Sequence, residues 1–201
     1  MKKAFVFLSK DPVLKKIIDH LDEELSLRHS ENYFHDLAEI IIFQQLSGKA
    51  ARTIFNRFLA LFPEKKPIPE LLLPLDENVL SAAGVSRQKR RYLKSLAENF
   101  VDKTIQPELF NEMSDKEIID KLTQVKGIGK WTAEIFLMFN LGREDVFPSD
   151  DLGLRKALQQ NFSLLELPSA KEAALFAEKW SPYRTIAALL LWRSLRIELP
   201  D

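Results

Sequence analysis

The segment from Val125 to Ala133 constrains the fold of this chain more than any other, because two glycines interrupt an otherwise helical pattern there. It reads Val-Lys-Gly-Ile-Gly-Lys-Trp-Thr-Ala. Glycine lacks a Cβ atom, so a tight turn between two helices can bring its backbone N–H groups close to an anion such as a phosphate. A helix end followed by an ordinary turn would also use two glycines, and Gly-x-Gly alone does not separate these interpretations.

The pattern of apolar residues predicts an all-α fold. Between Phe34 and Phe62 they recur three and four positions apart, which favours a helix pair over strands. Further helices are expected over residues 71–83 and 87–101. The sequence contains no convincing β-hairpin and no repeat.

Capping residues predict where several of these helices begin and end. Gly84 should end the helix over 71–83, and Ser86 should cap the helix that begins near Arg87. Ser114 and Glu117 have the spacing of a capping box, ahead of the helix that leads into the glycine turn.

A second informative segment follows the glycine turn by about two helix lengths. Residues 145–151 read Asp-Val-Phe-Pro-Ser-Asp-Asp. Acidic residues are common in the first turn of a helix, where they accept hydrogen bonds from free N–H groups and favour the helix dipole. Capping is an interpretation of both Asp150 and Asp151, and we prefer it for Asp150.

Four ordered segments resemble the helix-hairpin-helix DNA glycosylase superfamily, and within it the DNA-3-methyladenine glycosylase II family of alkylpurine DNA glycosylases. They are residues 42–51, 125–133, 145–151 and 180–192. The resemblance implies an all-α, two-lobed helical bundle with a helix-hairpin-helix motif and an active-site cleft between the lobes. Residues 1–201 would form a single glycosylase domain, with lobe A at about 34–145 and lobe B at about 1–33 plus 146–201.

The resemblance implies a DNA glycosylase that hydrolyses the N-glycosidic bond of alkylated purines, such as 3-methyladenine and 7-methylguanine, in base-excision repair. Asp151, followed by the basic Arg155 and Lys156, matches the catalytic aspartate of the superfamily. A carboxylate beneath C1′ would stabilise the positive charge that develops on the sugar in the transition state. Trp131 stands where bifunctional members carry a Schiff-base lysine, so we expect a monofunctional enzyme without lyase activity.

The remaining site residues also follow from the resemblance. Trp131 and Trp192 would hold the flipped base by stacking, and a cationic base would gain up to ~2 kcal/mol from cation–π attraction; core packing is the alternative for both. Gln45 matches the residue that fills the gap left by the extruded nucleotide, although an amide here could instead satisfy backbone groups of a buried helix pair. The expected DNA-binding residues of the hairpin are Gly127, Ile128, Gly129 and Lys130.

Some family pocket positions differ in this chain. Ile135, Leu152 and Arg193 replace pocket residues of the family, which leaves the range of damaged bases open. An oxidised or deaminated base is therefore an alternative substrate, and a non-catalytic helix-hairpin-helix DNA-binding protein is an alternative function.

No cofactor is expected for catalysis. The backbone carbonyls of Thr123, Val125 and Ile128 could bind a monovalent or magnesium ion that bridges to phosphate, as hairpins of this superfamily do. The chain has no cysteine, which excludes disulfides and the four-cysteine iron–sulfur cluster of many endonuclease III relatives. Its three histidines, at positions 20, 29 and 35, have no tight chelating spacing, and we expect surface or capping roles for them.

Charge and hydropathy complete the expectations. The 29 basic and 29 acidic residues give no net charge, so DNA binding must come from local asymmetry such as the basic run from Arg87 to Arg91. No stretch approaches the ~18 apolar residues of a membrane span. We expect a monomer that acts on double-stranded DNA containing alkylated bases, in the cytoplasm or, in a eukaryote, the nucleus.

Overall fold

The computed structural model describes residues 1–21, 25–27, 30 and 32–196, and these contain helices and no strands. The all-α class predicted from the sequence is confirmed. The helices are α1 (Lys2–Leu8), α2 (Pro12–Asp19), α3 (Tyr33–Phe43), α4 (Gly48–Leu59), α5 (Pro69–Leu72), α6 (Glu77–Ala82), α7 (Arg87–Val101), α8 (Asp115–Leu122), α9 (Lys130–Phe139), α10 (Leu152–Asn161), α11 (Ala170–Ala177) and α12 (Arg184–Ser194), with short 3-10 helices η1 (Pro63–Lys65), η2 (Pro107–Leu109) and η3 (Glu178–Trp180).

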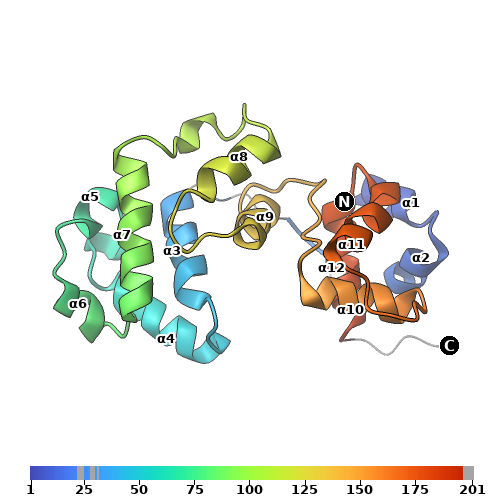
Figure 1. The fold of residues 1–201 in the computed structure, drawn as a ribbon, viewed down its shortest axis with the longest axis horizontal. Coiled ribbons are helices and arrows are strands. Elements are labelled where there is room, and N and C mark those ends of the chain that lie inside the picture. Colours follow the sequence, from blue (N-terminus) through green and yellow to red (C-terminus); the bar gives the residue numbers. More distant parts are fainter. Residues whose placement is uncertain (22–24, 28–29, 31, 197–201) are drawn as a thin grey trace. The chain divides into compact units, whose positions relative to one another are not determined.

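Residues 30–136 form a compact unit built around α3 and α7. Helix α3 packs against α4 and α7, and α7 also contacts α5 and α6 (Figure 1). The predicted helix pair over 34–62 is confirmed as α3 and α4. Its apolar face supplies much of the core of this unit, including the fully buried Leu37, Ile41, Ile42, Phe55 and Phe58.

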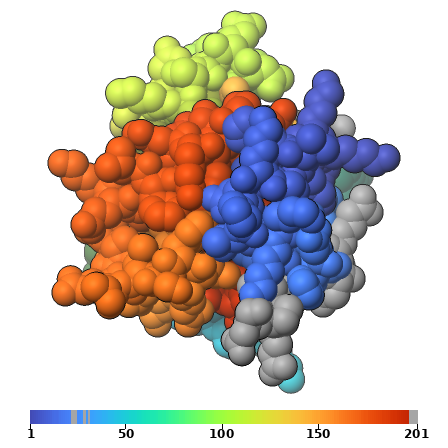
Figure 2. Space-filling view, turned by 90° about the vertical axis from the view of Figure 1, so that its right-hand side faces the viewer, coloured from blue at the N-terminus to red at the C-terminus, as the bar shows by residue number. Residues whose placement is uncertain are grey.

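The second compact unit combines the described residues before position 30 with residues from Leu137 onward. Helix α12 packs against α10 and α2, so the N-terminal helices lie beside the C-terminal ones (Figure 2). Trp180 is buried among Phe147, Phe162 and Phe176, and its indole Nε1 donates to the Asp11 carboxylate at 3.1 Å. Trp180 therefore belongs to the core that joins the two ends of the chain.

The division between the two units falls inside α9, ahead of the lobe boundary near Asp145 that the sequence suggested. The last turn of α9 contacts the C-terminal helices, since the Phe139 ring stacks on Trp192 at a centroid distance of 6.2 Å. No helix in the described part of the chain is long and apolar enough to cross a membrane.

The single helix predicted over 71–83 is wrong. The structure has two short helices there, α5 and α6, because Pro74 has no N–H group to continue the first and the Asp76 side chain caps the second by accepting from Asn78 N at 2.7 Å. The Lys94 ammonium on α7 donates to three backbone carbonyls at the break, those of Leu72, Leu73 and Leu75.

The predicted helix boundaries are confirmed at three other places. Gly84 has φ of +90° and ends α6, and the Ser86 hydroxyl accepts from Lys89 N at the start of α7. Ser114 and Glu117 form both hydrogen bonds of a capping box at the start of α8. Helix α8 is thereby fixed in the register that leads to the glycine turn.

Asp145 anchors the loop between α9 and α10. Its carboxylate accepts two hydrogen bonds from the Arg184 guanidinium, at 2.8 and 2.9 Å, and one from the Ser181 hydroxyl at 2.8 Å. The Thr185 hydroxyl accepts from Val146 N at 2.9 Å. Burial alone would raise the pKa of Asp145, but the hydrogen bonds from Arg184 and Ser181 outweigh it and hold the pKa below its ordinary value.

Replacing Asp145 by Asn should destabilise the fold by about 1–3 kcal/mol at neutral pH, because the partly buried Arg184 loses its charged partner. A carboxyl whose pKa is depressed by folding stabilises the protein above its unfolded pKa, close to the ordinary 3.8, and loses this contribution as the pH falls through the folded pKa. Urea unfolding from pH 7 down to pH 3 should show the difference between wild type and Asp145→Asn shrinking in acid. Glu112→Gln, at an exposed position, is the control. Equal stabilities at pH 7 would contradict this role.

Candidate functional site

The glycine turn between α8 and α9 is a tight hairpin fixed to two other helices. Ile128 N donates to Val125 O at 3.1 Å within the turn. The side-chain amide of Gln44, at the end of α3, donates to Gly127 O at 2.9 Å. Lys126 N donates to the hydroxyl of Ser95 on α7 at 3.3 Å. These bonds hold the hairpin backbone in one conformation.

The two glycines of the hairpin have different structural roles. Gly127 has φ of +90°, and a Cβ atom on it would overlap the Tyr92 ring on α7, so the fold itself requires glycine there. A Cβ atom on Gly129 would meet nothing within 4 Å. The open space at Gly129 is the part of the hairpin that a bound group could approach.

The candidate cation ligands at the hairpin are backbone carbonyls. Thr123 follows the last residue of α8, and the Val125 carbonyl accepts the Ile128 N–H. Over the described residues, no group of three or more His, Cys, Asp or Glu side chains is placed to hold a metal ion. His20 is exposed at the end of α2, His35 packs edge-on against Phe55, and His29 lies outside the described residues.

The connection between α3 and α4 projects Gln45 into solvent. Gln45 has φ of +55°, a left-handed conformation that is uncommon outside glycine and often found at functional sites. The Lys89 ammonium donates to Ile42 O at 2.7 Å and Gln44 O at 2.8 Å, and burial lowers the pKa of Lys89. The Gln44 amide thus satisfies a backbone carbonyl, the role considered as the alternative for Gln45, whereas Gln45 itself is exposed.

Trp131 lines a pocket next to this connection. The pocket has a volume of about 570 Å³, and its walls come from α3, the α3–α4 connection and α9: Ile40, Phe43, Gln44, Gln45, Trp131, Thr132 and Ile135. Trp131 is 41% exposed, whereas Met138 on the same helix is fully buried. Trp131 therefore lines the pocket, whereas Met138 packs in the core. Lys130 does not line this pocket, and its ammonium lies 3.5 Å from the carboxylate of Glu134.

Asp151 is the N-cap residue of α10. Its Oδ1 accepts from Leu154 N at 2.8 Å and from the indole Nε1 of Trp192 at 2.9 Å. The capping role that the sequence suggested for Asp150 is wrong, because Asp151 N donates to Pro148 O and the turn places Asp150 one residue before the cap. Capping does not conflict with a catalytic role for Asp151, since it fixes the carboxylate at the end of a helix.

Trp192 belongs to the same cluster as Asp151. Its ring is partly buried and stacks on Phe139 with an interplanar angle of 24°, while its N–H group bonds to the carboxylate. Gly153 provides the space for this arrangement, because a Cβ atom there would lie 2.9 Å from Asp151 Oδ1 and 3.4 Å from the Trp192 ring. Sequence reasoning missed both Phe139 and Gly153. The sequence signal that could have identified Gly153 is its position two residues after Asp151.

The expected site residues thus gather into two groups. Asp151 and Trp192 form one, with Leu152 half exposed at the start of α10. The hairpin, Gln45, Trp131 and Ile135 lie together in the unit around α3 and α7. That both groups face one cleft stays a prediction. Chemically, the first group offers a fixed carboxylate, and the second offers an aromatic pocket beside exposed backbone.

Comparisons with known proteins identify the family of this chain. The family model described as HhH-GPD superfamily base excision DNA repair protein matches residues 38–182. DNA-3-methyladenine glycosylase 1 of Schizosaccharomyces pombe is 36% identical over 186 residues, which cover 92% of this chain and 81% of that protein.

Solved structures give the same result. The S. pombe 3-methyladenine DNA glycosylase in complex with abasic DNA superposes with a TM-score of 0.84 at 33% identity, covering 99% of each chain. A DNA-3-methyladenine glycosidase from Bacillus halodurans gives a TM-score of 0.83 at 33% identity, covering 94% of this chain and 86% of that one. Family model, relatives and fold lead to one conclusion: the chain belongs to the HhH-GPD superfamily of base excision DNA repair proteins.

Proposed function

We propose that this protein is a monofunctional DNA glycosylase that hydrolyses the N-glycosidic bond of alkylated purines, such as 3-methyladenine and 7-methylguanine. The observation that carries the proposal is the Asp151 carboxylate, held at the start of α10 by Leu154 N and the Trp192 indole. The similarity to 3-methyladenine glycosylases supports the choice of lesion.

The reaction needs a negative charge near the sugar. As the bond between C1′ and the purine nitrogen lengthens, positive charge develops on the sugar, and a carboxylate near C1′ stabilises that charge more in the transition state than in the ground state. Water then supplies the hydroxyl group at C1′ and releases a proton, which the Asp151 carboxylate can accept. The helix cap and the indole hydrogen bond fix the carboxylate before the substrate arrives.

An alkylated purine needs little help as a leaving group. In 3-methyladenine and 7-methylguanine nucleotides the base carries a formal positive charge, and the electron pair of the breaking bond neutralises it. No proton has to be donated to the base, so the site requires no dedicated general acid. Trp131 would stack on the cationic base in the pocket beside Gln45. Trp192, with one face stacked on Phe139, would offer its other face to the base.

Water is the proposed nucleophile because this chain has Trp131 at the position where a Schiff-base lysine would stand. A lysine nucleophile would attack C1′ as a neutral amine within the pocket. Lys130, the adjacent residue, lies beside the buried Glu134 and does not line the Trp131 pocket. We therefore propose that the protein alone does not cleave the DNA strand.

The hairpin would bind the sugar–phosphate backbone. Gly129 leaves open space at the start of α9, where the first N–H groups of the helix favour an anion. Oxygen ligands from Thr123, Val125 and Ile128 suit a monovalent or magnesium ion, which would bridge hairpin and phosphate and take no part in the chemistry. Gln45, exposed in a left-handed conformation, would fill the gap in the duplex. The protein would act as a monomer on duplex DNA. Its compartment would be the cytoplasm or, in a eukaryote, the nucleus.

Base release from methylated duplex DNA tests the function. Wild type should release 3-methyladenine and 7-methylguanine, identified by chromatography, and leave the strand uncut until alkali is added. Asp151→Asn should slow release at least about a hundredfold, because the charge that stabilises the transition state is gone. Asparagine caps helices as well as aspartate does, so the variant should keep its fold and its affinity for DNA.

Asp150→Asn is the matched control. It removes the same charge from the neighbouring residue, which is exposed. It should release bases at close to the wild-type rate. If Asp151→Asn were as active as wild type, the assignment of Asp151 would be refuted. A covalent enzyme–DNA adduct trapped by borohydride would refute the monofunctional mechanism.

Substitutions of the two glycines should separate DNA binding from folding. Gly129→Ala should weaken binding to damaged and undamaged duplexes alike, while costing at most about 1 kcal/mol of stability, because its methyl group meets only the bound backbone. Gly127→Ala should lower the melting temperature clearly, because a left-handed alanine costs about 1–2 kcal/mol and the methyl group overlaps Tyr92. Fluorescence anisotropy and thermal melting measure the two effects. Normal duplex affinity in Gly129→Ala would show that the hairpin is only a turn.

A further inference from the structure

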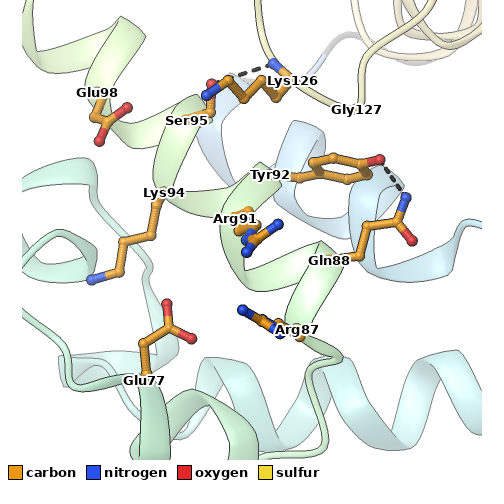
Figure 3. Close-up of a pocket in the computed structure, with 10 residues that line it drawn as sticks. All are labelled: Glu77, Arg87, Gln88, Arg91, Tyr92, Lys94, Ser95, Glu98, Lys126 and Gly127. Carbon is orange, nitrogen blue, oxygen red and sulfur yellow. Dashed lines mark hydrogen bonds between the residues drawn. The ribbon is translucent and has the colours of Figure 1, made fainter.

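An open groove of about 1000 Å³ runs along α7, in the same unit as the hairpin. Figure 3 shows its lining: Arg87, Gln88, Arg91 and Tyr92 come from α7, and Lys126 and Gly127 come from the hairpin. Apart from Gly127 of the hairpin, no residue of this groove has a part in the proposed base excision. Its position next to the hairpin and its basic lining raise the question of what it binds.

The basic run from Arg87 to Arg91 separates into two sets of side chains. Lys89 and Arg90 serve the fold, since Lys89 binds the carbonyls at the end of α3, and Arg90 donates to Glu77 and, at 2.8 Å, to Val85 O. Arg87 and Arg91 are exposed, and within the described part of the chain neither makes a side-chain hydrogen bond or ion pair. These two arginines are available to a ligand.

The other charges of the groove leave it positive. Glu77 is paired with Arg90, and the Lys94 ammonium is used by three backbone carbonyls. Glu98 lies at the end of the groove next to Ser95 (Figure 3). Two arginines and the exposed Lys126 therefore outnumber the one acidic residue without an ion pair, which favours an anionic ligand.

The two arginines lie one helical turn apart on the same face of α7, about 6 Å along its axis. In Figure 3 both guanidinium groups extend into the same part of the groove, between Glu77 and Tyr92. Arginine binds phosphate through two parallel hydrogen bonds, and successive arginines on one helix face suit an anion that repeats, such as a polynucleotide backbone.

The groove is continuous with the hairpin. Gly127 belongs to both, and its backbone rests so closely on the Tyr92 ring that no Cβ atom fits between them. Tyr92 is itself held by a hydrogen bond between its hydroxyl and the Gln88 amide, drawn in Figure 3. A strand that leaves the hairpin at Gly127 therefore reaches Lys126 and then Arg91 along one surface.

We propose that the groove along α7 carries the sugar–phosphate backbone of the bound DNA beyond the hairpin, with Arg91 and Arg87 contacting successive phosphates. This inference rests on the proposed function in one respect, the binding of DNA by the hairpin. The two arginines would read charge and carry no base specificity, so they add affinity for damaged and undamaged duplex equally.

The double variant Arg87→Ala/Arg91→Ala tests the groove. Its affinity for an undamaged duplex should fall about tenfold at moderate salt, and the slope of log K against log salt should decrease by about 2, because each neutralised phosphate contributes ~0.9 to that slope. Single-turnover base release from methylated duplex should keep its saturating rate, since the groove does not touch the reacting sugar. Lys2→Ala/Lys3→Ala, which removes two exposed charges from α1, should leave affinity and slope unchanged.

Three outcomes would overturn the proposal. One is a double variant with wild-type affinity and salt slope. Another is a saturating rate that falls as much as the affinity. The third is a poly-glutamate peptide that binds wild type but not the double variant while duplex binding is equal, which would assign the groove to an acidic protein. Because affinity is measured on undamaged duplex, a wild type that releases no base would refute the proposed function and leave the groove result intact.

Discussion

The hydrogen bond between the Trp192 indole and the Asp151 carboxylate is the contact on which the candidate active site depends. It joins α12 to Asp151, the residue immediately before α10, and the same carboxylate oxygen caps α10 by accepting from Leu154 N. An aspartate with free rotation would lose entropy on being placed beneath a sugar, whereas this one is fixed before any ligand binds. Gly153 permits the contact, because any side chain there would meet both partners.

The loop before Asp151 is held by a second set of contacts with the same purpose. Arg184 and Ser181 bind Asp145, and Thr185 accepts from Val146 N, so the first two residues of the segment 145–151 are tied to residues 181–185. The motifs at 145–151 and 180–192 resemble those of the glycosylase family. Several of their residues make these structural contacts. Asp145 and Trp180 hold the scaffold, and Asp151 is the member that we propose acts in catalysis.

Sequence reasoning succeeded where the determining interaction is local. The Ser114 capping box, the Ser86 cap and the end of α6 at Gly84 depend on neighbours within a few residues. It failed over residues 71–83, where Pro74 and the Asp76 cap outweighed the apolar pattern. It also could not distinguish Gly127 from Gly129, because the distinction depends on the Tyr92 ring from another helix, nor foresee that Trp192 binds the carboxylate across 41 positions.

Kinetics of Trp192→Phe test the account most directly. Phenylalanine keeps an aromatic ring to pack against Phe139 but lacks the N–H group, together with the five-membered ring that carries it. We predict that the saturating single-turnover rate of base release falls about tenfold or more for cationic and neutral lesions alike, because the carboxylate loses a hydrogen bond that orients it, while duplex affinity is unchanged. A wild-type rate, or a loss confined to cationic lesions, would contradict this role, because the indole N–H group would then not be needed to orient the Asp151 carboxylate.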